Sequence, residues 1–325
     1  MIARLLRLIL AVELLGAGLA AWLAVHIAGA SLGRGGAALL GAGLVLAVHP
    51  LMILVYFAIS RWAGTPPPTG AGLTPLAALK TFVLEYGASL RGFNLANPFF
   101  ATRAAPRPCP PLQALPLLFV HGYFCNRAVW LPLMSAAARR GYRVEAITLE
   151  PPFGGIERYC DAIEAAFSQL LEAGGATRAV VVCHSMGGIA ARAWLRRYGD
   201  ARVERVITLG SPHTGTVLAA LGRSGTVAQM RISSRWLADL AASESAARRA
   251  RFTCLYSYHD DVVVPQLSGR LEGARNVELC GLGHVTLLYS RRVWKILFDE
   301  LAALEIDPAA PQGAPRTRLS SALLP

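Results

Sequence analysis

The sequence predicts an α/β domain with a mainly parallel sheet flanked by helices, preceded by a two-helix hairpin in a membrane. Between residues 112 and 305, short apolar β-branched runs alternate with helical stretches. This alternation is typical of parallel sheets covered on both faces. Two long apolar segments precede this region, and one strand within it ends at Ser185, where an alanine-rich helix begins.

The chain is accordingly expected to have four parts. Residues 1–62 form a membrane anchor with two transmembrane helices, and residues 63–111 form a linker and a packing helix. Residues 112–305 form the α/β domain. Residues 306–325 are rich in proline and are expected to be disordered.

The membrane anchor is predicted from two apolar segments. Residues 8–30 contain one glutamate and one histidine, and residues 35–59 contain one histidine as their only interruption. A membrane-spanning helix needs about 20 such residues. The short turn between the segments favours a hairpin, in which glycines at positions 16, 18, 41 and 43 would let the helices approach closely. A cleaved signal peptide is the alternative for the first segment, although its apolar run exceeds the ~7 to 15 residues of a signal core.

Positively charged residues predict the orientation of the anchor. Arg4 and Arg7 precede the first segment, Arg34 lies in the turn, and Arg61 follows the second segment. Because positive flanks stay on the cytoplasmic side, both ends of the hairpin are expected inside, with the α/β domain cytoplasmic at a bacterial inner membrane. The alternative topology keeps one span and places the domain outside.

The linker leads into a helix that is expected to pack on the α/β domain. Prolines stiffen residues 64–70, and Thr74 followed by Pro75 reads as an N-cap with a first-turn proline. The expected packing face consists of Leu76, Leu79, Phe82, Val83 and Tyr86.

Ser185 has the surroundings of a catalytic nucleophile. Residues 179–184 read as a buried strand, and the serine follows at a tight turn into a helix. Such an elbow exposes the hydroxyl above the sheet edge, where a histidine can deprotonate it. Gly187 and Gly188 allow the turn to approach the preceding strand. Cys183 replaces the first glycine of the usual G-x-S-x-G pattern, and an ordinary strand-to-helix turn is the alternative.

A general base and its orienting acid follow in the order that this chemistry requires. Asp260 comes directly after a strand-like run, and His284 lies in a later glycine-rich loop. His284 would take the Ser185 proton and return it to the leaving group, while Asp260 would orient the imidazole. Asp261 is the alternative acid, because a strand end is uncertain by one residue.

Two backbone amides are candidates for an oxyanion hole. One is the N–H of Met186, immediately after the serine. The other lies where the apolar strand 117–120 ends in His-Gly, and we assign it to Tyr123, with Phe124 as the alternative. Removing one such donor typically lowers the rate by about 10² to 10³-fold.

These residues together resemble the bacterial lipases and esterases of the α/β-hydrolase superfamily. The resemblance covers about residues 116–304, and its five segments are the His121-Gly122 loop, the Ser185 elbow, the run Gly210-Ser211-Pro212-His213-Thr214-Gly215-Thr216, the Asp260 loop and the Gly283-His284 loop. It implies an α/β-hydrolase fold and hydrolysis of carboxylic esters, including lipid-like esters, through an acyl-enzyme. An acyltransferase on the same fold and a non-catalytic membrane scaffold are the alternatives.

An insertion at about residues 216–250 is expected to form a cap over Ser185. It contains apolar residues, Trp236 and Leu240 among them, next to several arginines. An apolar underside would close an acyl pocket from water. A helix pair that packs on the sheet is the alternative.

The charge of the chain indicates which kinds of partner it can bind. The net charge of +12 and a pI near 10.0 suit anionic lipid headgroups, although they also follow from a chain rich in arginine. No basic segment carries a nucleic-acid motif, and no metal or dinucleotide signature is present, so membrane lipids and an ester are the expected partners, without a cofactor. The six cysteines do not decide the compartment.

Overall fold

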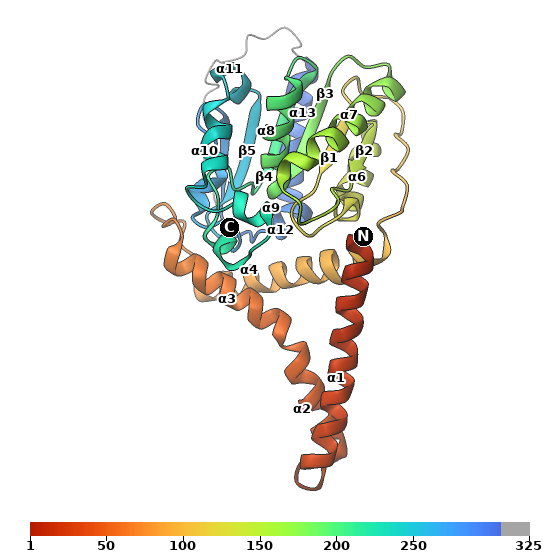
Figure 1. Ribbon diagram of the computed structural model, residues 1–325, viewed down its shortest axis with the longest axis vertical. Helices are drawn as coiled ribbons and strands as arrows, with labels where there is room; N and C mark the ends of the chain where they lie inside the picture. Colours follow the sequence, from red (N-terminus) through yellow and green to blue (C-terminus); the bar gives the residue numbers. More distant parts are fainter. Residues whose placement is uncertain (307–325) are drawn as a thin grey trace.

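A computed structural model describes residues 1–306, and it shows an α/β domain that stands on a set of N-terminal helices (Figure 1). The expected tail at 306–325 therefore lies almost entirely outside the described residues. The N-terminal elements are α1 (Ile2–Leu32), α2 (Arg34–Leu46), α3 (Val48–Ala63), α4 (Pro75–Ser89), the π-helical turn η1 (Leu90–Ala96) and α5 (Asn97–Phe99).

The α/β domain is built on a six-stranded sheet in the order β2-β1-β3-β4-β5-β6, with all neighbours parallel. This confirms the predicted sheet. The strands are β1 (Leu117–Val120), β2 (Val144–Ile147), β3 (Ala179–His184), β4 (Val203–Leu209), β5 (Phe252–Ser257) and β6 (Arg275–Leu279). Because all strands are parallel, their carboxyl ends share one edge of the sheet, which we call the carboxyl edge.

Helices cover both faces of the sheet, as the alternating sequence predicted (Figure 1). Alternate residues of β3 enter two different hydrophobic clusters, Val181 in one and Val182 in the other, because side chains alternate between the faces of a strand. The first cluster takes in α7 (Cys160–Gly174), α8 (Met186–Tyr198) and α10 (Arg235–Ala242). The second takes in α6 (Leu131–Ala138), α12 (Thr286–Tyr289) and α13 (Arg291–Ile306).

Among the described helices, α1 meets the length and hydropathy of a membrane span. Within residues 2–28, the most apolar 18-residue window has a mean hydropathy of 2.2, and only 6% of it is buried. The second apolar segment is not the single straight helix that the sequence suggested, since α2 and α3 meet at a bend of 42° and qualify only as a pair. Pro50 accounts for the bend, because it lacks the N–H that would bond the Leu46 carbonyl.

Close packing of α1 on α2 depends on one of the four glycines that were expected to allow it. A Cβ at Gly41 would overlap the Ala20 backbone, whereas Gly16 would make ordinary contact with Val45. The glycines at 18 and 43 have no such neighbour within 4 Å. Among these four positions, only position 41 therefore requires a glycine for the two helices to pack.

Helix α4 contacts the α/β domain through the opposite face from the one predicted. Leu76, Leu79 and Val83 are 76%, 57% and 55% exposed, so the prediction that they pack on the domain is wrong. The other two residues of the predicted face, Phe82 and Tyr86, are half-buried beside aromatic rings of α3. The buried face consists of Thr81, Glu85, Ala88 and Ser89. This buried side faces the domain because Glu85 and Thr81 form hydrogen bonds with the loop that follows β6.

The inserted segment mostly packs on the domain. Its helices are α9 (Gly225–Gln229), α10 and α11 (Ala246–Arg249). Leu240 of α10 is fully buried in the cluster that contains α7 and α8, and Trp236 Nε1 donates to Glu157 at 3.0 Å. Helix α10 thus has the packing role that was the alternative to a cap. Near the carboxyl edge, Thr226 of α9 bonds the loop after β2.

Candidate active site

Ser185 sits on a strained turn between β3 and α8. Its backbone has φ 54° and ψ −130°, a region that L-residues rarely adopt and that concentrates at functional sites. A Cβ at Gly187 would overlap the Val120 carbonyl, and one at Gly188 would overlap the Ser211 side chain. Both glycines are therefore required by the close approach of the turn to its neighbours. The Ser185 side chain stands at the carboxyl edge and is nearly buried.

The two adjacent aspartates have different partners. Asp260 Oδ2 accepts from His284 Nδ1 at 2.9 Å, and its other oxygen accepts the N–H groups of Val262 and Val263 at 2.9 and 2.7 Å. Asp261 Oδ1 instead accepts the backbone N–H of His284 at 3.0 Å. Asp260 thus has the geometry of the acid that orients an imidazole, and Asp261 holds the loop on which that imidazole is carried.

The histidine loop is bonded to the end of β3 next to Ser185, and the loop after β4 lies beside both. His184 Nε2 donates to the His284 carbonyl at 3.1 Å, and the two rings lie 4.6 Å apart. Leu209 accepts the Ser185 N–H at 3.0 Å, and a Cβ on the next residue, Gly210, would stand 3.3 Å from His284 Nδ1. The hydrogen bonds of residues 1–306 include none between Ser185 Oγ and His284, and in resting enzymes such bonds are often long.

The loop after β1 lies directly against the serine. A Cβ on Gly122 would come within 2.7 Å of the Ser185 Cβ, and Phe124 has a positive φ of 60°. In the described part of the chain, the backbone N–H groups of Tyr123 and Met186 donate to no other residue. The N–H of Phe124, the alternative to Tyr123, likewise donates to no residue there. The amide after the serine and either amide of this loop therefore have hydrogens available for an oxyanion.

Charges around His284 favour its protonated form. Burial alone would lower the pKa of the imidazole, but the charge and hydrogen bond of Asp260, with a contribution from Glu85, outweigh burial and raise it. Burial together with the charges of Glu85 and Asp260 raises the pKa of Asp261 well above its ordinary value.

Glu85 of α4 is a site residue that the sequence reasoning missed. It is 1% exposed and accepts three hydrogen bonds, from Val285 N at 2.7 Å, Thr286 N at 2.8 Å and Thr286 Oγ1 at 2.7 Å. Burial raises its pKa despite these donors. The two backbone N–H groups can only donate, so they favour the carboxylate. A glutamate in a helix outside the resembling region offered no signal in the sequence beyond its place among apolar neighbours.

Three further histidines near the site support loops. His121 Nδ1 donates to the Gly122 carbonyl at 2.7 Å, and its Nε2 accepts from Leu149 N at 2.8 Å. His213 lies in the core beside Thr208. Burial lowers the pKa of His121 to about 4 and those of His184 and His213 well below the ordinary value. These low pKa values favour the neutral rings. His121 and His184 bond backbone groups, whereas the His213 ring contacts the side chains of Thr208 and Cys254.

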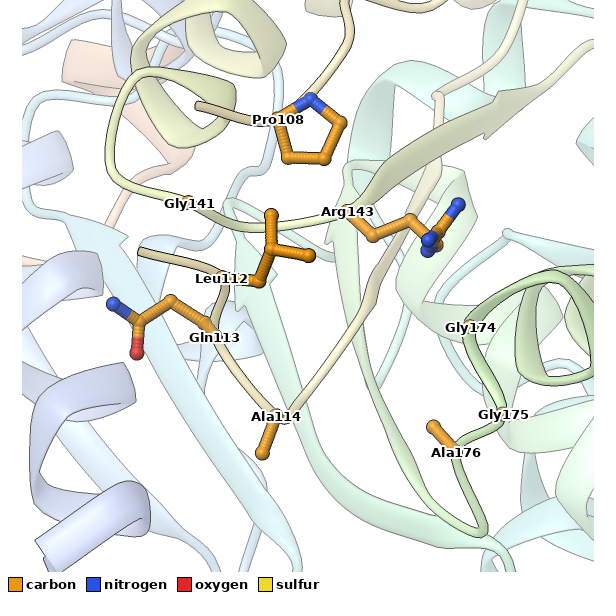
Figure 2. Close-up of a pocket in the computed structure, with 9 residues that line it drawn as sticks. All are labelled: Pro108, Leu112, Gln113, Ala114, Gly141, Arg143, Gly174, Gly175 and Ala176. Carbon is orange, nitrogen blue, oxygen red and sulfur yellow. The ribbon is translucent and has the colours of Figure 1, made fainter. Parts of the chain in front are cut away.

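No cofactor or metal cradle is evident in the described residues. Within residues 1–306, no group of three or more His, Cys, Asp or Glu side chains could hold a metal ion. A cavity of about 290 Å³ lies between Leu112, Gly141 and Gly174 (Figure 2). These residues precede β1, β2 and β3, so the cavity is at the opposite edge of the sheet from Ser185. Arg143 is its only charged lining residue, and it offers no nucleophile or base.

Comparisons with known proteins agree with this geometry. Residues 116–227 match a family model described as the alpha/beta hydrolase fold. The mature form of lipase BlEst2 from Bacillus licheniformis is 20% identical, with a TM-score of 0.54 over 62% of this chain and 97% of that chain. Lipase B of Aspergillus fumigatus is 15% identical, with a TM-score of 0.54 over 93% of this chain and 81% of that chain. The fold is therefore that of the α/β hydrolases, as predicted.

Proposed function

We propose that this protein is a membrane-anchored serine hydrolase that cleaves carboxylic esters, with lipid-like esters as its substrates. The observation that carries the proposal is the hydrogen bond between Asp260 and the His284 ring, on a loop bound to the strained turn of Ser185. The lipases with the same fold support an ester as the substrate class.

Acylation begins at the serine hydroxyl. His284 Nε2 takes the hydroxyl proton as Ser185 Oγ bonds to the ester carbonyl carbon, and the carbonyl π electrons move to oxygen. The N–H groups of Tyr123 and Met186 stabilise that oxyanion. As the carbonyl re-forms, the carbon–oxygen bond to the alcohol breaks, and His284 returns its proton to the departing oxygen. Asp260 stabilises the imidazolium between these steps.

Deacylation repeats the sequence with water in place of the alcohol. His284 accepts a proton from water, which adds to the acyl carbon. As the second tetrahedral species collapses, the bond to Ser185 Oγ breaks, His284 returns its proton to that oxygen, and the carboxylic acid is released. The raised pKa of His284 suits this shuttle, because a more basic imidazole is a better proton acceptor.

Membrane anchoring is supported by α1, whose length and exposure suit a bilayer. We propose that α2 and α3 together return the chain across the same bilayer. Pairing of α1 with α2, and hydrogen bonds from the end of α3 to the Asp260 loop, favour a retained hairpin over a cleaved leader.

A fluorophosphonate probe tests the nucleophile. The full chain in detergent should be labelled at Ser185 and should hydrolyse p-nitrophenyl esters. Ser185→Ala should abolish labelling and lower kcat by about 10³-fold or more, because the residual rate comes from binding and the oxyanion hole alone. Ser168→Ala, on the outer helix α7, is the matched control and should leave both unchanged.

The two aspartates provide a second check within the same assay. Asp260→Asn should lower kcat by about 10⁴-fold through the wrong imidazole tautomer. Asp261→Asn should retain most activity, because Asp261 bonds the backbone of His284 rather than its ring, and an amide oxygen can still accept that N–H. Persistent labelling of the Ser185→Ala variant would refute the nucleophile, and equal losses in the two aspartate variants would refute the acid.

A further inference from the structure

Helix α4 turns its apolar side away from the protein. Its buried residues include the carboxylate of Glu85, whereas Leu76, Leu79 and Val83 form an exposed stripe at the i, i+3, i+7 spacing of one helix face. We call these three residues the apolar stripe. A row of large apolar side chains on an exposed face is typical of a surface that binds a second apolar surface.

The neighbours of α4 have the chemistry of a membrane interface. Trp62, at the end of α3, is 88% exposed, and tryptophan is enriched at the boundary between lipid and water. Arg61 beside it, Lys80 on α4 and Arg91 just after α4 are also exposed. These cations suit anionic headgroups, and amphipathic helices that lie in the interface combine such residues with an apolar face.

The position of α4 relates the apolar stripe to the site. Figure 1 shows α4 lying across the base of the α/β domain while α1 and α3 run away from it. Each of these helices bonds a different loop of the carboxyl edge. Ile2 N donates to Glu150 after β2, Ser60 Oγ donates to the Asp260 carbonyl after β5, and Glu85 accepts from Val285 after β6.

We propose that α4 is an interfacial helix whose apolar stripe inserts among lipid acyl chains, so that the carboxyl edge faces the bilayer and membrane-resident esters reach Ser185 from it. A bilayer that holds α1 has its surface at the level of α4, because α1 begins at the same edge of the domain. This proposal rests on the proposed function for the reaction at Ser185. It holds for either side of the membrane.

The location of α4 can be measured in the full chain reconstituted into phosphatidylcholine and phosphatidylglycerol vesicles. In a Cys109→Ser, Cys280→Ser background, Leu79→Cys is labelled with bimane, and quenching by lipids with nitroxide-bearing acyl chains is recorded. Leu112→Cys is the matched control, since Leu112 is 62% exposed at the opposite edge of the sheet. The label at position 79 should be quenched several-fold more strongly than the label at position 112.

A second measurement links the apolar stripe to substrate access. Leu79→Asp with Val83→Asp should lower hydrolysis of a long-chain ester embedded in the vesicles by about tenfold, since charged residues disfavour the acyl region. Hydrolysis of dissolved p-nitrophenyl acetate should stay within about twofold, because these side chains touch none of the reacting groups. Leu112→Asp should change neither rate.

The outcomes separate this proposal from the proposed function. If the wild type hydrolyses neither ester, the proposed function fails, and the bimane result still decides where α4 lies. If the wild type hydrolyses both and the stripe variant matches it on both, the proposal for α4 is refuted. Equal quenching at positions 79 and 112 also refutes it, as when a second copy of the chain covers the stripe.

Discussion

At the scale of single residues, three carboxyl groups share the surroundings of one imidazole. Asp260 bonds the ring of His284, Asp261 bonds its backbone, and Glu85 bonds the two residues that follow it. The three carboxylates are chemically alike, but each accepts hydrogen bonds from a different part of the His284 loop, and this difference gives each a different role. The ring partner sets the tautomer, while the two backbone partners set where the ring stands.

Glu85→Gln should shift the pH dependence of hydrolysis. The negative charge of Glu85 stabilises the imidazolium and so raises the pKa of His284, and the base acts only when it is neutral. Without that charge His284 deprotonates at lower pH, and the acidic limb of kcat/KM moves to lower pH. The variant should also lose about 1–3 kcal/mol of unfolding free energy, since an amide nitrogen would face a backbone donor.

Exposed Glu272 provides the control, because Glu272→Gln should move neither the pH profile nor the melting temperature. The profile is recorded as kcat/KM with a dissolved p-nitrophenyl ester across the acidic range. A lowered melting temperature with an unmoved acidic limb would show that Glu85 acts on stability alone and has no electrostatic effect on His284.

At the scale of elements, α10 shows how an apolar helix in an insertion can belong to the core. Its residues Leu237 and Leu240 join the cluster under α7 and α8. A buried ion pair between Arg192 of α8 and Glu244, at 2.7 Å, holds the end of the same segment. Both contacts lie on a face of the sheet, where they stabilise the domain without covering Ser185.

Leu240→Ala should therefore destabilise the protein without changing its selectivity for acyl length. Deleting a fully buried leucine removes about 2–5 kcal/mol of unfolding free energy, measured by denaturant titration. Leu221→Ala, at a position that is 73% exposed, should change it by less than about 0.5 kcal/mol. Rates on long and short p-nitrophenyl esters should fall together. A loss confined to long esters would instead favour the cap that the sequence suggested.

At the scale of the whole molecule, the N-terminal helices leave the domain and return to it at the same edge. Helix α1 starts at the loop after β2, and α3 ends at the loop after β5. The connection between α1 and α2 lies at the end of these helices that is farthest from the domain (Figure 1). The two-span hairpin that we propose would therefore keep both of its ends on one side of a bilayer.

We expect that side to be the cytoplasm, because Arg4, Arg7 and Arg61 flank the ends and Arg34 alone lies in the turn. A reporter enzyme that is active only outside the cytoplasm should be inactive when it is fused after Leu304. The same reporter fused after Arg34, in the turn, should be active. Activity of the fusion after Leu304 would reverse the orientation, and inactivity of both fusions would contradict the two-span hairpin.

The sequence by itself determined the features that depend on neighbours along the chain. The strand, turn and helix around Ser185, the order of serine, acid and histidine, and the parallel sheet all follow from local sterics and apolar spacing. The sequence also identified Asp260 and Asp261 as the candidates for the acid, but it could not exclude either of them. The bend near Pro50 also has a local cause, the missing N–H of the proline. We did not predict it because residues 35–59 are apolar along their whole length.

The tertiary structure alone decided which aspartate faces the imidazole, which side of α4 is buried and that Glu85 belongs to the site. Glu85 lies 200 residues before Val285. The spacing of residues within one helix cannot predict a hydrogen bond to a donor so far away in the sequence. Apolar spacing predicts that a helix has an apolar face but does not say whether protein or lipid covers it. Three hydrogen bonds to a buried carboxylate outweighed that spacing in α4, because an unpaired charge in the same place would be far more costly.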